Sequence, residues 1–144
     1  MDPPPVIAAI RAIVHDALAP FADGAATVDV GWRDGWDAWV IEVTPADPDA
    51  AEVQIGLDRY GSLGIVVANS WTELPLFDDS LEQIRLIIGS VFRGQVAEIG
   101  RRSAAFVRVG SGKESVSFGA AHLPLPWSLR RVRRFSAYGG VGRC

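Results

Sequence analysis

Hydrophobic and polar positions alternate in two different periods along the chain, and the change of period predicts its elements. From Val6 to Phe21 hydrophobic residues recur every three or four positions, which is the period of an amphipathic helix. Short runs rich in valine, isoleucine and tryptophan then follow, separated by turn-forming residues. These runs are Ala26–Trp32, Trp36–Thr44, Ala51–Asp58 and Ser62–Ala68. We expect the four runs to form an antiparallel meander.

The helical period returns in the second half of the chain. Hydrophobic residues form one stripe between Asp78 and Arg93, and Gly94 is a typical residue at a helix C-terminus. Three further runs have strand character: Gln95–Arg101, Ala104–Val109 and Glu114–Phe118. The sequence therefore predicts an α+β fold in the order α-β-β-β-β-α-β-β-β, with an antiparallel, twisted sheet of about six or seven strands and two helices packed on one of its faces.

Length and composition limit the organisation of the chain. A chain of 144 residues fits one domain, and 49% hydrophobic residues supply enough material for its core. We therefore expect residues 1–144 to form a single α+β domain, with residues 123–144 as a basic C-terminal arm lying across it. No hydrophobic run approaches the roughly 20 residues that a membrane-spanning helix needs.

The single cysteine and the two histidines leave little material for metal or nucleophile chemistry. Cys144 has no second cysteine with which to form a disulfide, which favours a cytoplasmic protein. His15 and His122 do not form a metal-binding motif, and no serine lies in a nucleophile-elbow motif. The segment from Gly110 to Ser115 lacks two of the residue types that a phosphate-binding loop requires, so we expect a hairpin turn there. We expect no cofactor and no bound metal.

The net charge of −3 conceals an asymmetry along the chain. Residues 1–82 contain 15 acidic residues and three arginines, a balance of −12, whereas residues 83–144 contain two acidic and 11 basic residues, a balance of +9. The two halves of one domain either neutralise each other or form an acidic and a basic face, each able to attract a partner.

The basic arm allows three interpretations. Its arginines are Arg130, Arg131, Arg133 and Arg134, near the aromatic residues Trp127, Phe135 and Tyr138. Such residues could pair with the acidic half of the domain, bind a protein, or bind phosphates and bases of nucleic acid. A pI of about 5.3, far below the values above 9 of typical nucleic-acid-binding domains, argues against the third.

A group of tryptophan and aspartate residues is the most informative feature for function. Tryptophan anchors many protein interfaces, and the surrounding acidic groups could meet a basic partner. We therefore expect a partner-binding surface that includes Trp32, Asp34, Trp36, Asp37, Asp47, Asp49 and Trp71. The alternatives are that the tryptophans belong to the core and that the aspartates form turns, as loop aspartates usually do.

The Trp-rich first hairpin, the helix at Asp78–Arg93 and the ending from His122 through Leu123-Pro124-Leu125-Pro126-Trp127 into an Arg-rich arm resemble small immunity-type proteins of actinobacterial polymorphic toxin systems. The resemblance implies a non-catalytic, antitoxin-like protein that binds a cognate toxin and blocks it. Two alternatives are a secretion chaperone or adaptor for an exported partner, and an enzyme that uses His122. The sequence leaves the identity of the partner and the choice between monomer and dimer open.

Overall fold

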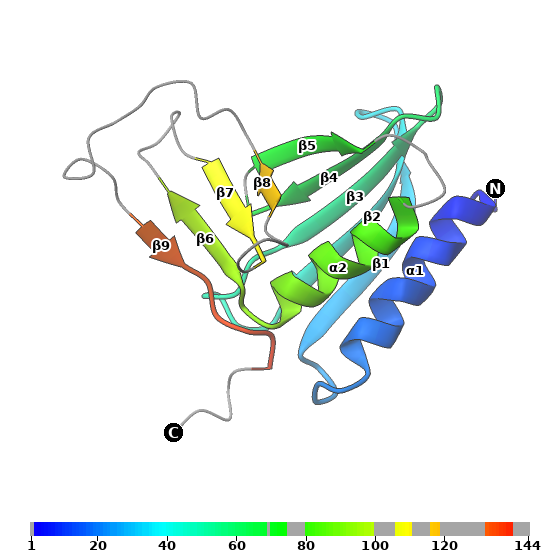
Figure 1. Ribbon diagram of the computed structural model, residues 1–144. Coiled ribbons are helices and arrows are strands. Elements are labelled where there is room, and N and C mark those ends of the chain that lie inside the picture. The colour runs from blue at the N-terminus through cyan, green and yellow to red at the C-terminus, as the bar shows by residue number, and fades with distance from the viewer. Residues whose placement is uncertain are drawn as a thin grey trace.

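The computed structural model describes residues 2–68, 70–74, 80–99, 106–110, 116–118 and 132–139. Within these ranges the chain forms two helices, α1 (Pro5–Leu18) and α2 (Ser80–Phe92). The strands are β1 (Ala26–Arg33), β2 (Ala38–Pro45), β3 (Val53–Asp58), β4 (Leu63–Val67), β5 (Ser70–Leu74), β6 (Val96–Ile99), β7 (Phe106–Val109), β8 (Val116–Phe118) and β9 (Val132–Arg134). The predicted α+β class is confirmed (Figure 1).

The strands form two antiparallel sheets, whereas the sequence predicted one. The larger sheet has the order β1-β2-β3-β4-β5 and the smaller one β8-β7-β6-β9. Two strands were not predicted. β5 lies between the fourth predicted run and the second predicted helix, where no strand was expected, because Ser70, Thr72 and Glu73 interrupt its hydrophobic pattern. β9 lies in the expected arm, and all three of its side chains are exposed, so it has no alternation to detect.

The register of the larger sheet brings its hydrophobic residues onto one face. Ile41 of β2 is paired with Ile55 of β3, which is paired with Ile65 of β4, and all three are fully buried. Their strand neighbours two residues away, such as Val43 and Val53, continue the same layer. Strand alternation therefore assigns one face of the sheet to the core.

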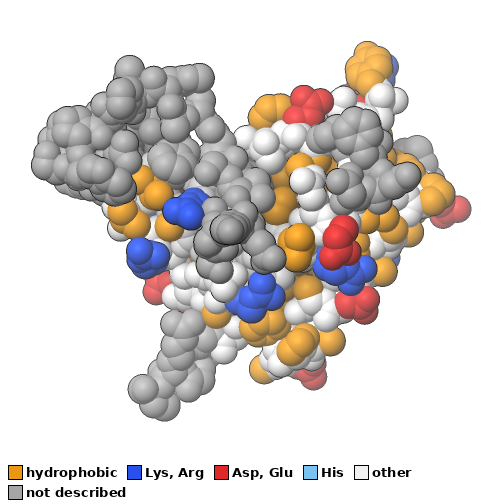
Figure 2. All heavy atoms as spheres, in the orientation of Figure 1, with side chains coloured by type: hydrophobic (Ala, Val, Ile, Leu, Met, Phe, Trp, Pro, Cys, Tyr) orange, Lys and Arg blue, Asp and Glu red, His pale blue; other side chains and the backbone are white. Residues whose placement is uncertain are grey.

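Both helices cover that face. Ile7, Ile10 and Val14 of α1 and Ile84 and Ile88 of α2 are fully buried in the same hydrophobic cluster as the sheet residues. The helices lie side by side and run in the same direction (Figure 1). On the outside of this layer hydrophobic side chains are interspersed with acidic and basic ones (Figure 2). None of the described helices is long and apolar enough to cross a membrane.

Residues 132–139 join the two sheets. The Phe135 amide donates to the Val96 carbonyl at 3.1 Å, and the Ser136 amide donates to the Asp49 carbonyl at 2.8 Å. Tyr138 is almost completely buried, packs on the Phe92 ring at 4.4 Å between centroids, and donates its hydroxyl to the Ala51 carbonyl. Burial, with a smaller effect from the charge of Glu52, raises the pKa of Tyr138 above its usual value.

Candidate functional site

The outer face of the five-stranded sheet, here called the open face, points away from α1 and α2. On β3 the side chains of Val53, Ile55 and Leu57 enter the core, so Gln54, Gly56 and Asp58 project to the other side. Trp71 and Glu73 of β5 also project there and are exposed. The open face therefore presents polar groups, glycines and a large aromatic residue.

Three glycines lie in one row across the open face, which we call the glycine row. Gly31 is paired with Val40, Val40 with Gly56, Gly56 with Gly64, and Gly64 with Glu73. Glycine weakens a strand interior and often marks a place where another group closely approaches the backbone. Val40 interrupts the row on β2, and the row ends at Glu73 on β5.

Trp71 shows what one of these glycines allows. An ideal Cβ atom on Gly64 would lie 2.7 Å from Nε1 of Trp71, closer than real Cβ contacts. The indole thus lies directly on the Gly64 backbone. Even so, Trp71 is 58% exposed, as is Trp36 in the hairpin between β1 and β2. Two large aromatic side chains are held on this face without being buried.

A hollow of about 430 Å³ lies between these tryptophans, and we call it the tryptophan hollow. Its floor comes from β3 and β4, which lie between Trp36 on one side and Trp71 on the other. The lining includes Gln54, Gly56, Asp58, Ser62, Gly64 and Glu73. Its volume is within the range of small-ligand sites, roughly 300–1,000 Å³.

A second hollow, of about 360 Å³, continues along the open face toward β1. Trp36 and Gln54 line both hollows, and Arg33, Val40 and Glu42 are among the other lining residues of the second. The two hollows therefore form one recessed surface across the sheet rather than two separate sites.

Acidic residues dominate the charge of the open face and its hairpins. Among the described residues these are Asp29, Asp34, Asp37, Glu42, Asp58 and Glu73. The two arginines that the structure describes there, Arg33 and Arg59, each pair with an aspartate: Nη2 of Arg33 lies 2.6 Å from Asp29, and Arg59 forms an ion pair with Asp37. These hydrogen bonds raise the pKa of both arginines. Six carboxylates and two guanidiniums leave a net charge of about −4, which favours a cationic partner.

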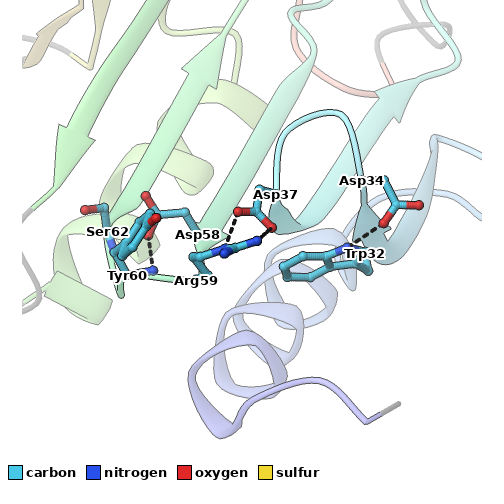
Figure 3. Close-up of polar contacts among 7 residues, drawn as sticks. All are labelled: Trp32, Asp34, Asp37, Asp58, Arg59, Tyr60 and Ser62. Atoms are coloured by element: carbon cyan, nitrogen blue, oxygen red, sulfur yellow. Dashed lines mark hydrogen bonds and ion pairs between the residues drawn. The ribbon is translucent and has the colours of Figure 1, made fainter.

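Hydrogen bonds fix the two hairpin tips beside the tryptophan hollow (Figure 3). Asp58 accepts from the amides of Tyr60 at 2.9 Å and Ser62 at 2.8 Å. Arg59 then reaches across to Asp37 in the other hairpin. Asp37 has a φ of 51°, a conformation that aspartate tolerates better than most residues. The ion pair thus ties the β1–β2 tip to the β3–β4 tip.

The structure brings five of the seven predicted partner-binding residues to this region. Trp36 and Trp71 line the same hollow, although they are separated by three strands of sequence. Trp32 is half-buried, packs edge-to-face on Trp39 at 6.2 Å between centroids, and donates its indole N–H to Asp34 at 2.9 Å. Trp32 therefore supports the hairpin, whereas Trp36 and Trp71 offer their surfaces.

The other two predicted residues lie elsewhere. Asp47 and Asp49 follow β2, at the opposite end of that strand from the hairpin that carries Trp36. Asp47 accepts from the Asp49 amide at 2.9 Å, which is a turn-forming contact, and the Asp49 carbonyl accepts from Ser136. The structure thus separates this loop from the tryptophan hollow.

The described part of the predicted basic arm, residues 132–139, begins with a strand of the smaller sheet. Arg133 and Arg134 lie on β9, paired with Glu98 and Ala97 of β6. The Arg133 guanidinium stacks over the Phe135 ring at 4.7 Å. Arg130 and Arg131 lie outside the described residues, as do His122 and Cys144. His15 lies exposed in the last turn of α1. In the described ranges no three metal-ligating side chains gather in one place.

Another hollow, of about 460 Å³, lies between the helices. Phe21, Leu86, Gly89, Arg85 and Arg93 are among its lining residues, and Leu86 is 49% exposed. Arg85 and Arg93 line this hollow together with Asp16, so it contains charges of both signs. The open face is therefore the better-defined candidate.

Sequence reasoning missed the glycine row, Gln54 and Glu73. Gly56 and Gly64 do interrupt otherwise alternating strands, which is a signal for a close approach. Their alignment, however, depends on strand register, and Glu73 lies on a strand that was not predicted. Comparison of the chain with protein-family models, curated proteins and solved structures gives no match in any of the three.

Proposed function

We propose that this protein is a non-catalytic protein-binding domain that uses the open face to hold a basic partner. In the role that its resemblance implies, the partner is a cognate toxin, and the protein acts in the cytoplasm as an immunity protein that blocks it. The observation that carries the proposal is the tryptophan hollow: two half-exposed indoles on opposite sides of a glycine-containing floor, within an acidic surface.

Physical reasons favour binding on this face. Tryptophan side chains supply much of the energy at protein interfaces, and their exposure here leaves that energy unused in the isolated domain. Hydrogen bonds and an ion pair fix the hairpin tips around them, so a partner meets a preorganised surface. The surplus of carboxylates would accelerate association with a basic protein.

The test is binding to the toxin encoded beside this protein's gene, measured by calorimetry with the full chain. We expect nanomolar affinity, and we expect Trp36→Ala and Trp71→Ala each to weaken it by about 30-fold or more, as truncation of a central tryptophan does. Leu86→Ala is the matched control, because it removes an exposed hydrophobic side chain from the helix side and should leave affinity unchanged.

Toxin activity must then fall as this protein is added. Tight binding that leaves the toxin fully active would overturn the inhibitory role and favour the chaperone or adaptor alternative. Equal affinity of the wild type and both tryptophan variants would overturn the assignment of the open face.

A further inference from the structure

We infer that the tryptophan hollow is a recognition site for an arginine side chain of the partner. The inference takes the binding face from the proposed function and names the chemical group that the face selects. The inference concerns one arginine side chain within a larger interface. Binding of a partner would therefore not by itself establish it.

The walls of the hollow suit a flat cation. Trp36 and Trp71 lie on opposite sides of the floor strands β3 and β4, and each keeps 58% of its surface exposed. A cation over the face of tryptophan is attracted by the negative charge of the ring face, more strongly than over tyrosine or phenylalanine. Guanidinium is planar and less strongly hydrated than ammonium, so it stacks on such rings at a smaller cost in lost hydration.

The polar groups of the hollow suit the edge of the same cation. Asp58 and Glu73 line it, and among the described residues no arginine or lysine does. Both described arginines near this face are instead paired with other aspartates, Arg33 with Asp29 and Arg59 with Asp37. Within the described part of the chain, Asp58 and Glu73 therefore share the hollow with no cation, and Gln54 adds a side-chain carbonyl as a further acceptor.

The floor provides depth. Gly56 and Gly64 are paired across β3 and β4, and because the Trp71 indole lies on Gly64, the depth is at Gly56. A Cβ atom on Gly56 would meet only atoms at 3.8 Å or more, so its absence leaves free space rather than relieving a clash. A long side chain could thus enter until its terminal group lies level with the indoles.

The charge of the face excludes the other common ligands of aromatic sites. Nucleic-acid bases also stack on tryptophan, but their phosphates would meet a surface with six carboxylates and only two paired arginines in its described part. Anionic lipid headgroups meet the same repulsion. An arginine presented by a basic protein satisfies both the rings and the carboxylates.

The test uses three pentapeptides, each with capped ends and two glycines on either side of a central arginine, lysine or citrulline. Citrulline has the shape of arginine without its charge. The full chain, labelled with nitrogen-15, is titrated with each peptide while the indole N–H signals are followed by NMR. We expect the signals of Trp36 and Trp71 to shift, those of Trp32 and Trp39 to stay, and arginine to bind about tenfold or more tightly than citrulline, as a cation–π contact reinforced by a charged hydrogen bond predicts.

Two variants locate the site. Glu73→Gln should weaken arginine binding about threefold or more, whereas Glu82→Gln, an equal change of charge on α2, should not. Gly64→Ala places a Cβ atom 2.7 Å from Nε1 of Trp71, so the indole must move while the strand keeps its backbone conformation. We expect Gly64→Ala to remove the arginine preference while the rest of the spectrum stays folded.

Equal binding of arginine and citrulline peptides, or equal effects of Glu73→Gln and Glu82→Gln, would overturn the inference. If a toxin still bound through Trp71 in that case, the proposed function would stand without it. Selective arginine binding without any effect on the toxin would leave the inference standing and overturn the proposed function.

Discussion

At the scale of single residues, the most consequential polar contact is one that the alternation of the sequence does not indicate. Tyr138 donates its hydroxyl to the carbonyl of Ala51, which is 87 positions away, and both residues are buried. In the sequence Tyr138 was one of several aromatic residues near the arginines of the arm. Its packing on Phe92 makes it part of the core.

Tyr138→Phe should therefore destabilise the protein without changing its shape. The ring keeps its contacts, but the Ala51 carbonyl loses a buried donor, which costs about 1–2 kcal/mol of unfolding free energy. Denaturant titration measures the difference, and Tyr60→Phe, at a residue that is 83% exposed, is the control. Equal losses of unfolding free energy in both variants would contradict a stabilising hydrogen bond from the Tyr138 hydroxyl.

The same substitution should change the response to alkali. Burial raises the pKa of Tyr138 above its usual value of 10.0. Above pH 10 the unfolded chain therefore binds fewer protons at this residue than the native one, and stability falls as pH rises. The wild type should therefore lose more stability than Tyr138→Phe between pH 10 and 11, which denaturant titration at several pH values measures.

At the scale of elements, the alternation of hydrophobic and polar residues predicted which face of each strand is buried. It did not predict which residues are paired across neighbouring strands. The burial of Val53, Ile55 and Leu57, between neighbours that are only partly buried, follows from a period of two. The pairing of Gly56 with Gly64 does not, because it depends on the length of the turn between β3 and β4. Trp36 and Trp71 could thus be selected individually from the sequence, but their shared hollow could not.

The β3–β4 hairpin offers an element-scale prediction. Asp58→Ala removes the acceptor of two turn amides and should cost about 1–2 kcal/mol of unfolding free energy. Asp58→Asn keeps a carbonyl oxygen at the same position and should retain most of that stability. Thermal unfolding distinguishes the two. If asparagine were as damaging as alanine, the negative charge rather than the hydrogen bonds would be the stabilising feature.

At the scale of the whole molecule, the structure shows where part of the charge asymmetry of the sequence lies. Six of the 13 described acidic residues in the first half lie on the open face and its hairpins, while Arg133 and Arg134 lie on β9 of the other sheet. Sequence arithmetic gave the size of this imbalance but not its location, because location depends on how the two sheets are joined.

Gly94 lies at that junction, just after α2. Its φ of 77° and a distance of 2.5 Å from an ideal Cβ atom to the Ala137 amide nitrogen leave no room for a side chain. Gly94→Ala should cost about 2–4 kcal/mol, and Gly24→Ala, which has a similar φ of 82° but open space around it, about 1 kcal/mol. Denaturant titration of both variants isolates the steric part. Equal losses of unfolding free energy in the two variants would mean that residues 132–139 can shift away from the added Cβ atom at little cost.

The short strand β5 decides which way α2 runs. Each antiparallel strand carries the chain to the other end of the sheet, so five strands after α1 return it to the end where α1 begins. An odd number of strands therefore makes the two helices parallel, whereas the four-strand meander expected from the sequence would have made them antiparallel. Loss or gain of two strands together would keep the number of strands odd and the helices parallel. Loss of β5 alone would make the number even and the helices antiparallel. The least hydrophobic strand of the larger sheet thus sets the direction of half of the helical layer.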